Sequence, residues 1–186
     1  MYPPPRWDLT NIFPSLESKE FTAAFGQLQT KISDLGDYFD EVVTKADAKT
    51  PPKELGAILG DVVDRFNDTY LLSSTVGAYV SFHVDTNSHD QLAKRRESEF
   101  EQAAVPLRKL GVRFKAWLGK IAPALDGALP HHPSAQAHAF NLMEAAEQSK
   151  YLMPEELEGL AAELTLSGGN AWGKLEGTVT SQLTVD

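Results

Sequence analysis

Cysteine is missing from the 186-residue chain. Its absence excludes disulfide bonds, zinc sites built from thiolates and cysteine nucleophiles. A chain without disulfides fits a reducing compartment, so we expect a cytoplasmic protein.

Positive charge is also scarce, because 17 Lys and Arg residues face 26 Asp and Glu residues, a formal net charge of -9. A field of this sign repels phosphate backbones, so nucleic acid is not an expected partner. No run of about 18 apolar residues occurs, and Met1–Arg6 holds three prolines where a secretory signal needs an apolar stretch. We therefore expect a soluble protein with no membrane partner and, at 42% hydrophobic residues, an ordinary core.

The zinc-binding motif H-E-x-x-H is a third absence. Helical zinc sites use histidines one turn apart, because a four-residue step places both rings on one face. His131, His132 and His138 lie upstream of Glu144 and Glu147, but their spacing fits no helical ligand pair. Prolines flank the first two, so we interpret them as solvated loop histidines. A histidine-based metal binder is therefore the weakest functional hypothesis.

The other polar clusters also have structural interpretations. His83 lies in a row of apolar residues at helical spacing, so we expect its ring to be half-buried with its hydrogen bonds satisfied. Ser167–Asn170 is expected to close a helix rather than hold an anion. Lys94–Arg96 should form ion pairs with the glutamates that follow it. Four more carboxylates are expected to lie on one helix, whose acidic first turn is stabilised by the positive end of the helix dipole: Glu155, Glu156, Glu158 and Glu163.

Apolar residues at alternating gaps of three and four predict long helices. The first such row of apolar residues, or seam, is Phe21, Phe25, Leu28, Ile32, Leu35, Phe39 and Val42. Either Ser15 or Ser18 should cap the start of this helix. The second helix should begin at Thr50-Pro51-Pro52, and a capping box of Ser88 and Gln91 should open the third. Pro106 lies inside the third seam, so we expect a kink or break near Val105. Short links place neighbours antiparallel, which predicts three long helices within residues 1–122.

Residues 123–133 are rich in proline and glycine and are expected to form a linker. Residues 134–186 should form shorter helices, followed by a strand over Thr178–Asp186, where β-branched residues alternate with polar ones. The predicted fold class is all-α, an elongated antiparallel bundle or hairpin of long helices followed by shorter ones, with a short carboxy-terminal strand that lacks its partner.

Several strings of the sequence resemble the oligoendopeptidase F family of thimet-type zinc metallopeptidases. The stretch Trp7–Phe13 resembles the family's start, and Tyr79–Glu101 resembles its long helical segment. Tyr151–Met153, Glu155–Glu158 and Leu164–Trp172 resemble the segment that precedes the family's catalytic domain. The order of these strings along the chain makes coincidence improbable.

The resemblance implies an amino-terminal helical region that faces a deep cleft and restricts entry to short or unfolded peptides. In that family zinc is held by H-E-x-x-H and a downstream glutamate, so no catalytic or metal residue is expected here, and zinc would belong to the parent enzyme alone. Residues 134–186 would then lead into a truncated catalytic domain. That domain would be the chain's main partner, and its loss should leave apolar surface that favours self-association.

Two functional hypotheses remain from different classes. The first is the substrate-gating part of an intracellular metalloendopeptidase, without activity of its own; the second is a non-enzymatic helical interaction module with a stable partner. Trp172 and Tyr151 could line the peptidase cleft, although burial in a core is the commoner fate of such aromatics.

Overall fold

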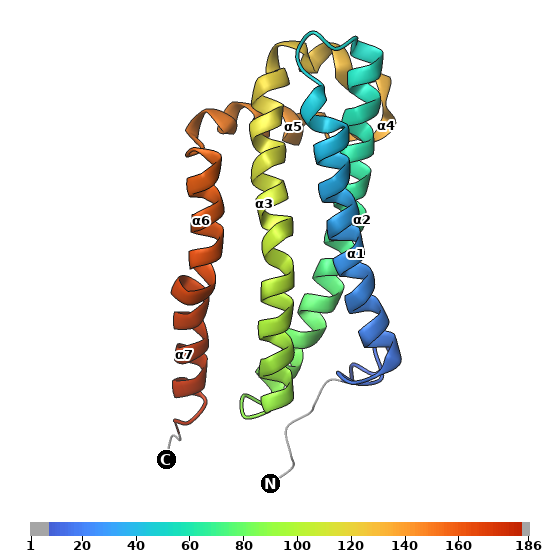
Figure 1. The fold of residues 1–186 in the computed structure, drawn as a ribbon. Coiled ribbons are helices and arrows are strands. Elements are labelled where there is room, and N and C mark those ends of the chain that lie inside the picture. Colours follow the sequence, from blue (N-terminus) through green and yellow to red (C-terminus); the bar gives the residue numbers. More distant parts are fainter. Residues whose placement is uncertain (1–7, 184–186) are drawn as a thin grey trace. The chain divides into compact units, whose positions relative to one another are not determined.

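The computed structural model describes residues 8–183, except for the side chain of Glu155, and within these residues the regular structure is helical (Figure 1). The α-helices are α1 (Lys19–Glu41), α2 (Pro52–Thr86), α3 (Gln91–Ala128), α4 (Pro133–Ala137), α5 (Ala139–Gln148), α6 (Glu155–Thr165) and α7 (Ala171–Thr180). Short 3-10 turns are η1 (Val43–Lys45), η2 (Leu129–His131) and η3 (Ser149–Tyr151), and a π-helical turn, η4 (Leu166–Asn170), precedes α7. The all-α prediction is confirmed for this part of the chain.

The starts of the long helices follow local chemistry. The Ser18 hydroxyl accepts a hydrogen bond from the Phe21 amide at 3.1 Å, which satisfies a free donor at the start of α1 as predicted. At α3 the cap is the Asp90 carboxylate, which accepts from the Leu92 amide at 2.9 Å, so the cap predicted at Ser88 was wrong. An aspartate directly before the helix reaches these amides more readily than a serine two residues earlier.

The chain divides into two compact units, and the division falls inside the long helices. The first unit comprises the described residues of Met1–Gln29, Leu71–Val105 and Glu163–Asp186. The second unit comprises Thr30–Tyr70 and Pro106–Ala162.

The core of the first unit is built on aromatic rings from α1, α2 and the segment before α1. Phe13 meets Phe21 and Tyr79 edge to face, with ring centroids 5.6 and 5.0 Å apart. The buried Tyr79 hydroxyl donates to the Phe13 carbonyl at 2.9 Å, which satisfies its polar tip. The segment before α1 is thereby fixed on the unit's core.

The second unit has its own aromatic core. Phe39 on α1, Phe66 on α2 and Phe114 on α3 contact one another at centroid distances of 5.2–6.3 Å. Trp117 stacks on Phe114, and its indole N–H donates to the Ala46 carbonyl at 3.0 Å. The three apolar seams read from the sequence therefore meet here.

Most of residues 123–133, where the sequence predicted a linker, are helical: α3 ends at Ala128, η2 follows to His131, and α4 begins at Pro133 after the extended His132. Helix α3 contains both Pro106 and Pro123, so of the kink or break expected near Val105 the break does not occur. The helix after η2 is capped by His132, whose ring nitrogen accepts from the Ser134 amide at 3.3 Å. The His132 ring also lies against Gly60 of α2, where a methyl group would overlap it. The three-part division of the chain into residues 1–122, 123–133 and 134–186 stays a prediction.

The strand predicted over Thr178–Asp186 is wrong for the described residues, which contain no strand. Residues 178–180 end α7, a turn follows, and Val185 and Asp186 lie outside the described residues. The hydroxyls of Thr178 and Thr180 donate to the carbonyls of Lys174 and Glu176 at 2.8 and 2.9 Å, a bond that lets threonine remain helical. A strand here would also have had no neighbour with which to pair.

Candidate functional site

The histidines proposed as a weak metal cluster do not come together. His131 is exposed, His132 caps α4, and His138 lies 3.3 Å from the Asn67 amide. Within the described residues no three His, Asp or Glu side chains gather closely enough to hold a metal ion. The expectation of a solvated loop residue is wrong for His132, because its ring is half-buried against Gly60.

His83 is half-buried on α2, as predicted, and its ring meets Tyr79 edge-on at 4.8 Å. Its Nε2 atom has no hydrogen-bond partner among the described residues, so the expectation of a satisfied histidine is wrong. No carboxylate or hydroxyl accompanies this nitrogen, so the arrangement gives it no acid–base partner.

The basic run on α3 forms ion pairs with a neighbouring glutamate, as predicted. Arg95 and Arg96 contact the Glu99 carboxylate at 3.0 and 2.8 Å. The hydrogen bond from Arg96 lowers the pKa of Glu99 most, and the nearby charges add to it. These ion pairs stabilise their own helix face.

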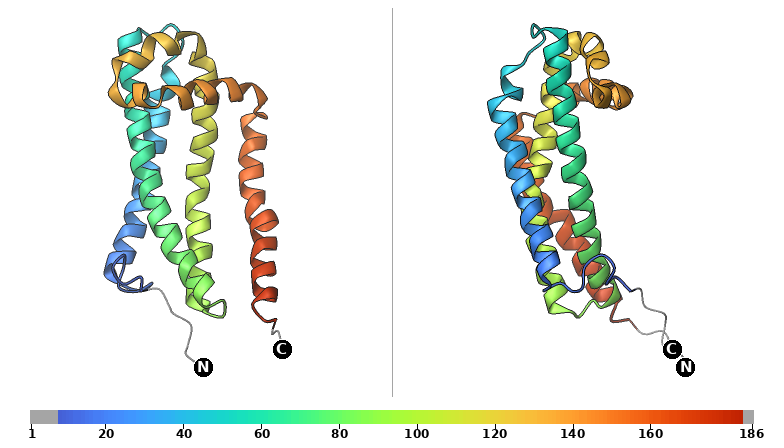
Figure 2. Two further views of the ribbon diagram at one scale, coloured as in Figure 1. Left: turned by 180° about the vertical axis from the view of Figure 1, so that it is seen from behind. Right: turned by 90° about the vertical axis from the view of Figure 1, so that its right-hand side faces the viewer.

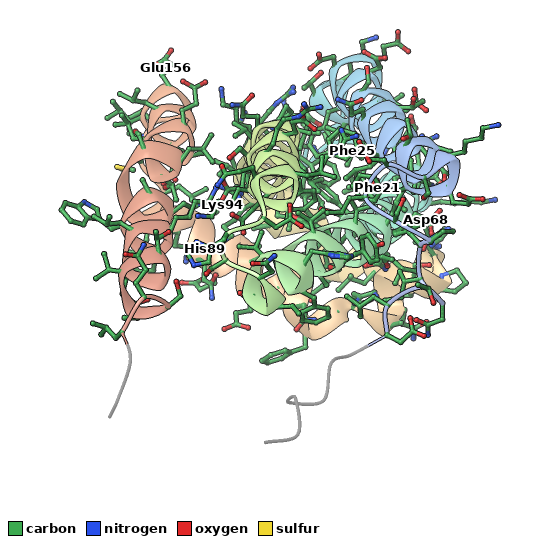
Figure 3. The ribbon with its side chains drawn as sticks, turned by 90° about the horizontal axis from the view of Figure 1, so that it is seen from below. Phe21, Phe25, Asp68, His89, Lys94 and Glu156 are labelled. Carbon is green, nitrogen blue, oxygen red and sulfur yellow. The ribbon has the colours of Figure 1, made fainter. Side chains whose placement is uncertain are left out.

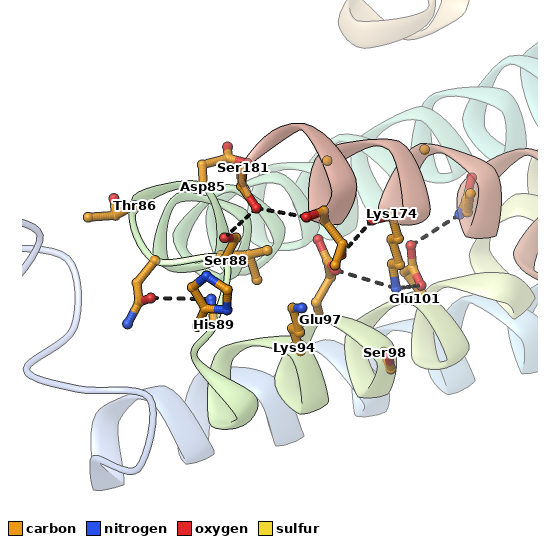
Figure 4. Close-up of a pocket in the computed structure, with 16 residues that line it drawn as sticks. Asp85, Thr86, Ser88, His89, Lys94, Glu97, Ser98, Glu101, Lys174 and Ser181 are labelled. Atoms are coloured by element: carbon orange, nitrogen blue, oxygen red, sulfur yellow. Dashed lines mark hydrogen bonds and ion pairs between the residues drawn. The ribbon is translucent and has the colours of Figure 1, made fainter. Parts of the chain in front are cut away.

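Lys174 of α7 lies between two carboxylates of α3 (Figure 4). Its ammonium is 2.5 Å from the Glu101 carboxylate and 3.4 Å from that of Glu97. Burial alone would lower the pKa of Lys174, but the hydrogen bond that Lys174 donates to Glu101 and the charges of both glutamates outweigh it, so the pKa is raised. We call Lys174, Glu97 and Glu101 the ionic cluster.

Two further polar contacts join α7 and its flanks to the rest of the first unit. Asn170 donates to the Glu101 carboxylate at 3.2 Å, and Ser88 donates to the Ser181 hydroxyl at 2.9 Å. The views in Figures 1 and 2 agree that α7 lies beside the turn between α2 and α3.

An open cleft of about 900 Å³ lies between α7 and this turn. Asp85, His89 and Lys94 line it from the α2–α3 side, and Figure 3 shows His89 and Lys94 on the side of α3 toward α7. Gly173 and Gly177 line it from α7, and a methyl group on either glycine would have no neighbour within 4 Å. Acidic and basic side chains both line the cleft.

The opposite face of α7 is apolar and exposed. Trp172 is 71% exposed, Leu175 51% and Val179 53%, and α7 contains no buried residue. The helix therefore faces its unit with its polar side and presents its apolar side outward. The expectation that Trp172 and Tyr151 would pack in a core is wrong for this chain, since Tyr151 is 84% exposed.

The prediction that Ser167–Asn170 would close a helix is wrong, because α7 follows them directly. These residues form the turn η4, in which Gly168 leaves helical geometry at φ -93° and ψ -106°. Helices flank the turn on both sides, so the glycines kink the path where the sequence predicted a stop. Two consecutive glycines signal a departure from helix but do not reveal whether another helix follows.

Comparison with protein-family models gives one match, to the amino-terminal region of the M3 peptidases described as Oligopeptidase F, over residues 123–184. The resemblance read from the sequence is confirmed for this segment, which is about a third of the chain and includes α7. No match to a catalytic domain occurs in the chain. Neither the curated proteins nor the solved structures give a match.

The M3 family is zinc-dependent, but the described residues do not fit a zinc site. Zinc in this chemistry needs about three protein ligands and an open position, and no such group of side chains is present in the described part of the chain. No catalytic step is therefore assigned to any residue here. Within that part, no helix is both long and apolar enough to cross a membrane.

Proposed function

We propose that this chain is the amino-terminal, substrate-gating helical region of an intracellular zinc metalloendopeptidase that hydrolyses short peptides. The observation that carries the proposal is the match of residues 123–184 to the amino-terminal region of oligopeptidase F. The chain itself supplies helical walls rather than chemistry, and zinc and the residues that activate water belong to the catalytic part of the parent enzyme.

The exposed face of α7 supports this role. α7 lies inside the matched segment, and its outward side carries Trp172, Leu175 and Val179. Apolar side chains at helical spacing are stabilised when another apolar surface covers them, at about 25 cal/mol per Å² of area removed from water. The catalytic domain of the peptidase is the partner that we propose for this face.

The first test is the coding sequence that follows Asp186. We expect an open reading frame that contains H-E-x-x-H, and a full-length product that cleaves short fluorogenic peptides in the presence of zinc. Removal of zinc with a chelator should abolish cleavage by the full-length product, and residues 1–186 alone should cleave nothing. A stop codon directly after Asp186 would overturn the proposal.

Gating is tested with the full-length enzyme on peptides of increasing length and on a folded protein. We expect cleavage to fall steeply with substrate length, because helical walls admit only short or unfolded chains. Equal cleavage of short peptides and of long unfolded chains would show that the helical region does not select by length.

A second candidate is a helical protein-interaction module that acts without a peptidase, and the exposed face of α7 favours it as well. The two candidates differ in what covers α7. Sedimentation of residues 1–186 at rising concentration measures self-association, and a Trp172→Ser variant should weaken it if this face pairs with another copy. A stable complex with a protein encoded elsewhere would favour the module.

A further inference from the structure

Helix α7 is attached to the first unit in an unusual way. Its hydrogen bonds and ion pairs to α3 and to the α2–α3 turn come from Asn170, Lys174 and Ser181. Asn170 and Lys174 are one turn apart and Ser181 is two turns further on, so all three lie on the inner side of the helix. Gly173 and Gly177, near that side, face open space. Hydrogen bonds and ion pairs thus hold this helix in place, because none of its own side chains is buried.

The turn that precedes α7 has the properties of a hinge. Gly168 departs from helical geometry, and a methyl group on Gly168 or Gly169 would meet nothing within 4 Å. A small rotation about these residues therefore meets little steric resistance. Hinges are commonly a few residues at the ends of elements that absorb a backbone change.

We propose that α7 is a movable strap, hinged at Leu166–Asn170 and latched by the ionic cluster, and that its release widens the cleft between α7 and the α2–α3 turn. With the latch closed, Lys174 joins Glu97 and Glu101, and the Ser88–Ser181 hydrogen bond closes the far end. With the latch open, α7 and its glycines no longer form the second wall of the cleft opposite Asp85, His89 and Lys94.

The energetics make such a device workable. An element with few buried apolar contacts opens at low free energy, so modest ion pairs decide its position. The side chains of the cluster are 18–36% exposed, which leaves them partly open to screening by salt. The Debye length falls from about 10 Å at 0.1 M salt to about 3 Å at 1 M. Salt should therefore release the strap while the aromatic cores stay folded.

The lack of native cysteine makes a clean experiment available. A Ser88→Cys, Ser181→Cys double variant places two thiols where the hydroxyls are 2.9 Å apart, so the rate of disulfide formation under a fixed oxidant reports the closed strap. We expect this rate to fall at least about threefold when Glu97→Gln and Glu101→Gln are added, given the modest strength of exposed ion pairs.

The matched control is Glu99→Gln in the same double-cysteine background. Glu99 lies on the same helix and forms ion pairs with Arg95 and Arg96 but not with α7, so its removal should leave the rate unchanged. Salt alters thiol reactivity itself, so the decisive comparison is between variants. In the double-cysteine variant, 1 M salt should slow disulfide formation because it releases the strap. In the variant that also lacks Glu97 and Glu101, this effect of salt on the strap should be absent.

Amide hydrogen exchange provides a second measurement, made on the chain without introduced cysteines. Amides of α7 should exchange faster in the Glu97→Gln, Glu101→Gln variant, while those around Tyr79 in the core of the first unit stay protected. Equal rates of cross-linking and of exchange in all variants would overturn the strap. Neither measurement uses peptide cleavage, so the strap can fail or stand independently of the proposed peptidase role.

Discussion

Helices α1 and α7 both carry an apolar seam, but they use it in opposite ways. Phe21, Leu28 and Phe39 of α1 are each at most 1% exposed. Trp172, Leu175 and Val179 of α7 are each more than 50% exposed. The same kind of sequence pattern thus yields a core in one helix and an open surface in the other.

The difference teaches what an apolar period specifies. Spacing of three and four residues determines which face of a helix is apolar, because side chains at those steps lie on one side. It does not determine whether the chain brings another apolar surface to that face. Three seams meet around α1, whereas the polar side of α7 carries its ties to α3.

The largest expected effect separates these two kinds of seam. Phe39→Ala should lower the free energy of unfolding by about 3–5 kcal/mol, because it leaves a cavity among the rings of Phe66 and Phe114. Leu175→Ala removes a side chain that is 51% exposed and should change it by less than about 0.5 kcal/mol. Urea unfolding followed by far-UV circular dichroism measures both. Similar losses in the two variants would mean that α7 is packed after all.

A second comparison uses glycines in a packed and an unpacked helix. Gly60→Ala should destabilise by about 1–3 kcal/mol, because the added methyl group overlaps the His132 ring. Gly177→Ala meets nothing within 4 Å and should instead favour helical α7 by about 0.5–1 kcal/mol. Thermal unfolding measures the first change and amide exchange in α7 the second. A stabilising Gly60→Ala would contradict the close approach of His132.

The smallest expected effect concerns one buried hydroxyl. Tyr79→Phe should cost about 1 kcal/mol, because the Phe13 carbonyl loses its 2.9 Å donor inside the core. Tyr38→Phe is the matched control, since the Tyr38 hydroxyl makes only an exposed 3.4 Å contact with Asp61. Denaturant midpoints at equal slope give the difference. If the two variants lose the same stability, burial of the Tyr79 hydroxyl is not what holds the segment before α1.

Much of the helical fold could be predicted from the sequence. The first seam and the Ser18 cap located the start of α1, because both signals are local. The break that Pro106 suggested and the linker that Pro123 suggested do not occur, because both prolines lie within α3. A proline's cost can be outweighed by the packing of neighbouring turns, such as those of Leu107 and Ile121, both at most 2% exposed. The strand predicted from the β-branched residues near the carboxy terminus was also wrong, because the hydroxyls of Thr178 and Thr180 form hydrogen bonds within α7.

The candidate site was harder to predict. The ionic cluster joins Lys174 to residues more than seventy positions earlier in the chain, and no local pattern encodes such a pairing. Glu97 and Glu101 were correctly expected to form ion pairs, but with the basic run beside them rather than with α7. One signal was available: α7 places glycine and lysine on one side and tryptophan, leucine and valine on the other. That split predicts an amphipathic helix, but not which side faces the protein.

The glycines divide into two groups with different evolutionary freedom. At Gly56, a methyl group would overlap the Ala128 carbonyl, and at Gly77 it would come within 2.6 Å of the Phe100 ring. At Gly26, Gly36 and Gly173 it would meet nothing within 4 Å. Sequence drift among descendants of this chain should therefore be slow at the first two positions and fast at the other three. A substitution at Gly77 would survive best in a lineage that had already shortened Phe100.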